Sequence, residues 1–168
     1  MTNGGGSVLL YQVENEELAS VGPYADYVKK IIKAAKEDGI NVPIFHNDYA
    51  PVGNWAFTTK DTGLDVYSYD DYPIRFDCSA TRHKLQDHNW HIDPAFRAAH
   101  HSPHFIAEAQ GGAFTPWGAS FNASACEKFV DANFYRQWAA LNNGAGVTAF
   151  NYYMIFGGTN WGWTGSAH

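Results

Sequence analysis

A helix pattern enclosed by two strand patterns is the feature that most constrains how this chain can fold. Residues 7–13 and residues 41–48 are short apolar runs with β-branched and aromatic side chains, as in buried strands. Between them, residues 24–38 repeat apolar side chains at helical spacing, and Gly39 follows where a helix commonly ends. A strand, a helix and a strand in succession predict a crossover between parallel strands.

The rest of the chain continues this alternation. Further strands are predicted at residues 64–70, 104–108 and 147–156, and residues 72–103 are predicted to form a long loop with one short helix at 95–99. A second long helix is predicted to start at a capping box, Ser124 to Glu127, and to end at Gly144. Its apolar stripe consists of Phe129, Val130, Phe134, Trp138 and Leu141.

This pattern predicts the α/β class with a parallel sheet covered by helices, because the strands do not alternate polar and apolar residues. The expected architecture is a (β/α)₈ barrel. A complete barrel takes about 250 residues, whereas this chain has 168 residues and five predicted strands. We therefore expect an incomplete barrel.

Composition excludes some functions and favours others. The net charge is −6 and no basic stripe is present, so a nucleic-acid partner is not expected. No window reaches the roughly 18 apolar residues of a membrane span, and the first residues lack the pattern of a signal peptide. Aromatic residues make up 16% of the chain and it has 16 glycines, which favours a loop-rich enzyme or a sugar-binding surface.

Carboxylates follow two of the predicted strands. Glu14 and Glu16 come after the first strand and Glu108 ends the fourth. In a barrel the active site lies at the carboxyl ends of the strands. Two carboxyl groups with different pKa values could serve as acid/base and nucleophile, as in glycoside hydrolysis. The alternative is that they are ordinary solvated acids at strand ends.

Four sequence blocks carry a resemblance to a known family. They occur in order along nearly the whole chain: YQVENE at 11–16, YSYDDYP at 67–73 with FDC at 76–78, EAQGG at 108–112 with PWG at 116–118, and NYYM at 151–154 with FGGTNWG at 156–162. Together they resemble the family 35 glycoside hydrolases, the β-galactosidases, and most closely the large secreted fungal enzymes.

The resemblance implies a retaining exo-β-galactosidase that removes terminal β-D-galactose. Glu16 matches the acid/base and Glu108 the nucleophile that forms the galactosyl ester. Asn15 matches the asparagine that holds the sugar 2-hydroxyl, and Tyr72 and Tyr153 match tyrosines that contact galactose or the nucleophile. The five strands would be strands 4 to 8, so that residues 1–168 would be the C-terminal part of the catalytic barrel.

Three positions depart from the family pattern next to these residues. Glu17 replaces a usual tyrosine, Val13 a common proline, and Ala109 a common aromatic residue. None of these changes removes a reacting group.

The resemblance also implies a disulfide between Cys78 and Cys126 and secretion of the protein. Two free buried thiols are the alternative for the cysteines. Asn122 begins an N-glycosylation sequon that agrees with secretion, although Ser124 could instead be only a helix cap.

No metal or cofactor is expected, because the histidines between His83 and His104 do not have the spacing of a ligand set. The expected partner is a β-galactoside oligo- or polysaccharide, and the whole protein is expected to be a monomer. Two alternatives stay open: an inactive or carbohydrate-binding barrel fragment, and a retaining β-glycosidase with another sugar specificity. The 168 residues alone are expected to show almost no turnover, because the missing strands would supply contacts that orient the sugar.

Overall fold

Five parallel strands form a single sheet in the order of the sequence. The computed structural model describes residues 6–18, 22–57, 59–74, 99, 101–112 and 126–155. Each strand pairs in parallel with the next one along the chain. The strands are β1 (Tyr11–Asn15), β2 (Ile44–Asp48), β3 (Val66–Asp71), β4 (Phe105–Gln110) and β5 (Ala149–Tyr153). The predicted incomplete α/β barrel is therefore confirmed.

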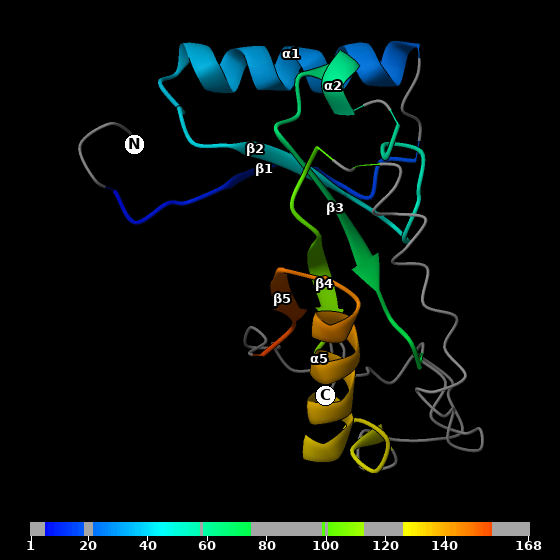
Figure 1. Cartoon of the computed structure of the whole chain (residues 1–168). Coiled ribbons are helices and arrows are strands. Elements are labelled where there is room, and N and C mark those ends of the chain that lie inside the picture. Colours follow the sequence, from blue (N-terminus) through cyan, green and yellow to red (C-terminus); the bar gives the residue numbers. More distant parts are fainter. Residues whose placement is uncertain are drawn as a thin grey trace, which may run out of the picture.

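Three helices lie between strands in the described part of the chain. Helix α1 (Pro23–Glu37) connects β1 to β2, the short helix α2 (Thr59–Thr62) lies between β2 and β3, and α5 (Ala132–Gly144) precedes β5. In Figure 1, α1 and α2 lie together near β1 and β2, whereas α5 lies beside β4 and β5. The sheet twists between these two groups, as parallel strands in a barrel do.

Helix α1 follows the sequence prediction closely. Pro23 occupies the start of the helix, where its missing N–H costs no hydrogen bond. The helix buries Ala25, Val28, Ile32 and Ala35, which share one face at helical spacing. Gly39 follows with a φ of 85°, a left-handed conformation that glycine adopts without strain.

The predicted start of the second long helix was wrong. Helix α5 is capped by Asp131, whose Oδ1 accepts a hydrogen bond from the Phe134 N–H at 2.8 Å. Just before it, the carbonyl of Cys126 accepts bonds from the N–H groups of Phe129 and Val130, so this segment is a separate turn. The helix therefore begins after the predicted capping box; Ser124 itself lies outside the described residues.

All five strands differ from their predicted ranges by a few residues at the ends, and β1 and β5 differ most. Strand β1 begins at Tyr11 rather than at residue 7, because pairing with β2 starts there, and Leu9 is 79% exposed. Strand β5 covers Ala149–Tyr153 rather than 147–156. Of the predicted stripe on α5, Phe134 and Trp138 are buried but Leu141 is exposed. Of the short helix predicted at 95–99, only Ala99 belongs to the described residues, where it is part of a turn.

The main hydrophobic core lies between the sheet and its helices. It includes Val28 of α1, Ile44 of β2, Ile106 of β4 and Trp138 of α5, each fully buried. A smaller cluster has Phe45, Val66, Phe105 and Ala107 on three adjacent strands. Since side chains alternate along a strand, Asn47 shares the face of Phe45, and Asp70 shares the face of Val66. The helix-covered face thus supports the sheet, and the other face carries the polar residues described next.

None of the helices in the described residues is long and apolar enough to cross a membrane.

Candidate active site

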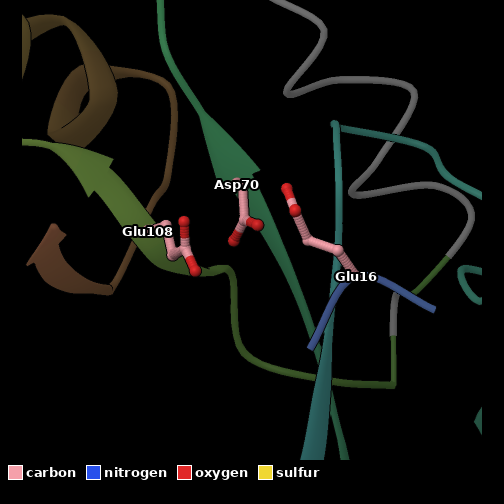
Figure 2. A group of neighbouring side chains, drawn as sticks. All are labelled: Glu16, Asp70 and Glu108. Atoms are coloured by element: carbon pink, nitrogen blue, oxygen red, sulfur yellow. The ribbon is translucent and has the colours of Figure 1, made fainter. Parts of the chain in front are cut away.

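Three carboxylates from three different strands meet at the carboxyl end of the sheet. Glu16 directly follows β1, Asp70 lies near the end of β3, and Glu108 lies in β4. One oxygen of each lies within 4.8 Å of the others. Figure 2 shows the three side chains directed toward a common space. The parallel pairing of β1 to β4 brings together residues that are up to 92 positions apart (108 minus 16).

Glu16 has a strained backbone. Its φ is 53°, in the left-handed region that residues other than glycine rarely occupy. Its N–H donates to the Asn47 carbonyl at 3.1 Å, which ties the end of β1 to β2. The side chain is exposed. Such a conformation persists only where surrounding contacts hold it, and it is commonest at functional sites.

Glu108 is half-buried and is held by Tyr72. The Tyr72 hydroxyl donates to Oε2 of Glu108 at 2.5 Å. Burial raises the pKa of Glu108, the hydrogen bond from Tyr72 opposes this, and the nearby charge of Glu16 raises the pKa further. A short bond from a tyrosine to a carboxylate fixes the direction of its oxygens.

Asp70 is almost completely buried, with 1% of its surface exposed. Burial raises its pKa well above the usual value of an aspartate, and the charges of Glu108 and Glu16 act in the same direction, against the hydrogen bond from Asn47. The raised pKa means that Asp70 favours its protonated, neutral form. A neutral Asp70 avoids placing three negative charges within one small space.

Asn47 connects these residues. Its Nδ2 lies 2.8 and 3.0 Å from the two oxygens of Asp70, 3.1 Å from Oδ1 of Asn15 and 3.5 Å from Oε1 of Glu108. An amide group has two hydrogens, so it serves two of these oxygens at a time. Gln12 donates to Oδ1 of Asn47 at 2.6 Å, which fixes the orientation of the amide.

The structure brings together four of the five predicted catalytic and substrate-binding residues. Asn15, Glu16, Tyr72 and Glu108 all belong to the network around Asn47 and Asp70. Tyr153 lies at the end of β5 with 51% of its surface exposed, and its carbonyl accepts a bond from the Gly111 N–H. No described contact joins its side chain to the two glutamates, so its role stays a prediction.

Glu14, the other acid named at the first strand, does not point toward the three clustered carboxylates. It accepts a hydrogen bond from the Tyr27 hydroxyl of α1 at 2.6 Å, and this bond lowers its pKa. Glu14 therefore helps to attach α1 to β1 and does not join the cluster.

Two of the other predicted sites lie outside the described residues. These are Cys78 and the sequon residue Asn122. Cys126 is 3% exposed, and its pairing with Cys78 stays a prediction.

A hollow of about 630 Å³ opens beside the acid cluster. Glu16 and Tyr72 line it together with Leu18, Tyr49 and Asn54. Aromatic and polar side chains of this kind are typical of sites that bind small polar ligands. The spacing of the three carboxylates would also suit a cation, but burial raises the pKa of Asp70 and so disfavours the charged form of Asp70 that would bind a metal.

An incomplete parallel barrel with acids at the carboxyl ends of its strands is typical of the (β/α)₈-barrel enzymes, whose active sites lie at that end. Comparison with known proteins identifies the family. The sequence model of glycosyl hydrolases family 35 matches residues 1–168. The chain therefore belongs to glycosyl hydrolases family 35.

Two fungal proteins show the extent of the similarity. "Probable beta-galactosidase A" of Aspergillus flavus and "Beta-galactosidase A" of Aspergillus oryzae are each 37% identical to the chain over 175 residues. These matches cover 96% of this chain but only 16% of each relative.

A solved structure supports the fold. "Faecalibacterium prausnitzii Beta-glucuronidase" matches with a TM-score of 0.52 and 17% identity, over 86% of this chain and 24% of that one.

Sequence reasoning missed Asn47 and Asp70. Both are buried polar residues within strands, Asn47 in IFHND and Asp70 in VYSYDD. A polar residue at a buried strand position near the carboxyl end is the signal that could have identified them.

Proposed function

We propose that the protein carrying this chain is an exo-acting β-galactosidase that hydrolyses terminal β-D-galactose with retention of configuration. The observation that carries the proposal is the distance between Glu16 and Glu108, whose nearest oxygens lie within 4.8 Å. Retaining glycosidases hold their two carboxyl groups about 5–5.5 Å apart, whereas inverting ones need about 6.5–9.5 Å for a water molecule. The choice of galactose is supported by the names of the two Aspergillus relatives.

In the first step, Glu108 attacks the anomeric carbon of the galactoside. A bond forms between a Glu108 oxygen and this carbon while the bond to the leaving oxygen breaks, and Glu16 gives the leaving oxygen its proton. In the second step, Glu16 takes a proton from water, and the water oxygen replaces Glu108 at the anomeric carbon. Galactose then leaves in the β form, and both glutamates regain their starting states.

The neighbouring residues have supporting roles in this proposal. The hydroxyl of Tyr72 orients Glu108 through its 2.5 Å bond. Asn15, whose Oδ1 accepts from Asn47, is proposed to hold the 2-hydroxyl of the sugar. Tyr153 is proposed to contact galactose. Residues 1–168 are proposed to be the C-terminal part of the catalytic barrel, and secretion of the protein remains part of the proposal.

The test compares nitrophenyl β-galactoside and nitrophenyl β-glucoside as substrates of the full-length protein. NMR follows which anomer of the sugar appears first. We expect preferred hydrolysis of the galactoside and first release of the β anomer. First release of the α anomer would contradict retention. Equal or faster hydrolysis of the glucoside would indicate a β-glycosidase of other specificity, and no hydrolysis of either would indicate a carbohydrate-binding relic.

A further inference from the structure

Glu17 follows the proposed acid/base, Glu16. Both polar groups of the Glu17 backbone, the N–H and the carbonyl, form hydrogen bonds with buried side chains. Its N–H donates to Nε2 of His46 at 3.0 Å. Its carbonyl accepts from the indole Nε1 of Trp55 at 2.5 Å. With the bond from the Glu16 N–H to the Asn47 carbonyl, three consecutive contacts attach the end of β1 to β2 and the segment after it.

These contacts surround the strained residue of the site. Glu16 has a φ of 53°, and such a conformation is unfavourable unless its neighbours hold it. The side chain of Glu16 is exposed and its carboxyl is hydrogen-bonded to Asp70, so the backbone on each side must place this carboxyl within reach of its partner. The groups that hold Glu17 therefore determine where the Glu16 carboxyl lies.

His46 and Trp55 are suited to this task because both are rigid. Each is 0% exposed, and their rings lie 4.8 Å apart at an interplanar angle of 36°. The backbone N–H of Trp55 donates to Oδ2 of Asp48 at 3.1 Å, and this bond anchors the segment that carries the indole. Neither side chain can move without disturbing the core.

The protonation state of His46 suits a hydrogen-bond acceptor. Burial lowers the pKa of His46 to about 4, against the charges of Glu14 and Glu17, so the ring is neutral at neutral pH. A neutral imidazole has one donor and one acceptor nitrogen. Because Nε2 faces the Glu17 N–H, it must be the acceptor, and Nδ1 carries the proton.

We propose that His46 and Trp55 are positioning residues that hold the backbone of Glu17 and thereby set the Glu16 carboxyl for proton transfer to the leaving group. The role rests on the proposed function of Glu16 as acid/base. Neither residue lines the hollow beside the acid cluster, so the proposed role is an indirect one. Their effect depends on how strongly a substrate needs its leaving group to be protonated.

The test measures kcat/KM of the full-length protein on two β-galactosides. Dinitrophenyl β-galactoside has a leaving group that needs little protonation, whereas methyl β-galactoside has one that needs full protonation. General acid catalysis contributes about 10²–10⁴-fold, and a misplacement of about 1 Å can cost about 10²-fold. For His46→Leu, which has no acceptor, we expect kcat/KM to fall about 10-fold or more on the methyl substrate and less than about 3-fold on the dinitrophenyl substrate.

Two further variants separate positioning from general damage. His46→Gln, whose side-chain oxygen can accept at the place of Nε2, should restore most of the activity on the methyl substrate. Trp55→Phe, which removes the indole N–H, should reproduce the substrate-dependent loss. Ile44→Val is the control, because Ile44 is buried in the same core and its side chain has no group that could hydrogen-bond to the Glu17 backbone. This control should leave the ratio of the two kcat/KM values unchanged.

The outcomes distinguish the positioning role from the proposed function. If the wild-type protein hydrolyses galactosides and His46→Leu loses both activities equally, the positioning role is overturned. If the wild type hydrolyses no aryl glycoside, the proposed function is overturned. Nitrogen NMR of the His46 ring at neutral pH is a test that does not depend on enzyme activity. We expect a proton on Nδ1, and a proton on Nε2 would overturn the positioning role.

Discussion

Replacing Tyr72 with phenylalanine removes the single described hydrogen bond donor that touches Oε2 of Glu108. This bond favours the ionised form of Glu108 and opposes the effect of burial on its pKa. Hydrogen bonds to charged groups contribute about 1.5–3 kcal/mol, which corresponds to about 1–2 pKa units at 1.36 kcal/mol per unit. Because Glu108 is only half-buried, solvent screening favours the lower end, about 1 unit.

The direction in which the pH profile moves follows from the need for an ionised Glu108. Glu108 must be deprotonated to attack, so the acidic limb of the pH profile of kcat/KM reports its pKa in the free enzyme. In Tyr72→Phe this pKa rises, and we expect the acidic limb to move about 1 unit toward higher pH. The measurement is kcat/KM on nitrophenyl β-galactoside as a function of pH. The matched control is Tyr24→Phe, since the Tyr24 side chain is exposed on α1.

An acidic limb in Tyr72→Phe that stays in place, or that moves to lower pH, would refute this reasoning. It would mean that the hydroxyl does not stabilise the charge of Glu108. A shift of the same size in the Tyr24→Phe control would also refute it, because that variant leaves the site untouched.

Three further predictions concern stability and the acid/base. Burial raises the pKa of Asp70 in the folded protein above its value in the unfolded chain. The contribution of the neutral carboxyl to the free energy of unfolding is therefore complete below the unfolded pKa and is lost as the pH rises toward the folded pKa. Asp70→Asn, which resembles the neutral acid, should raise the urea midpoint at neutral pH and flatten its decline with pH; a lower midpoint would contradict the protonated state. Trp138→Ala should lower the free energy of unfolding by about 3–5 kcal/mol, because Trp138 is fully buried against Phe150 and Tyr152; a loss below about 1 kcal/mol in urea denaturation would show that this packing matters little. Glu16→Gln should reduce kcat/KM much more on methyl β-galactoside than on dinitrophenyl β-galactoside, and equal losses would argue against Glu16 as the general acid.

The sheet was predictable because its signals are local. The helix at residues 24–38 lies between two apolar runs, and chain connectivity then requires parallel strands. The start of α5 was not predictable in the same way. The sequence predicts a start at Ser124 to Glu127, whereas in the structure a turn follows Cys126 and Asp131 caps the helix. Tertiary contacts, rather than local preference, therefore place this boundary.

The site was predictable only in part for a similar reason. Glu16 and Glu108 stand at strand ends within recognisable sequence blocks, and the resemblance to family 35 supplies roles for them. Asn47 and Asp70 lie inside strands, and their importance depends on which strands are neighbours. His46 and Trp55 act on the backbone of Glu17, and a backbone contact of this kind leaves no residue pattern in the sequence.

The most direct test of the central proposal is to trap the covalent intermediate. An activated galactoside with fluorine at carbon 2 slows both chemical steps, because the fluorine destabilises the positively charged transition state. The activated leaving group keeps formation of the galactosyl ester faster than its hydrolysis, so the ester accumulates. Peptide mass spectrometry of the full-length protein then identifies the labelled residue. We expect one label per molecule, on Glu108. A label on Asp70, on Glu16 or on any other residue would contradict the assignment of Glu108 as the nucleophile, and so would the absence of any label in a protein that hydrolyses the unfluorinated galactoside.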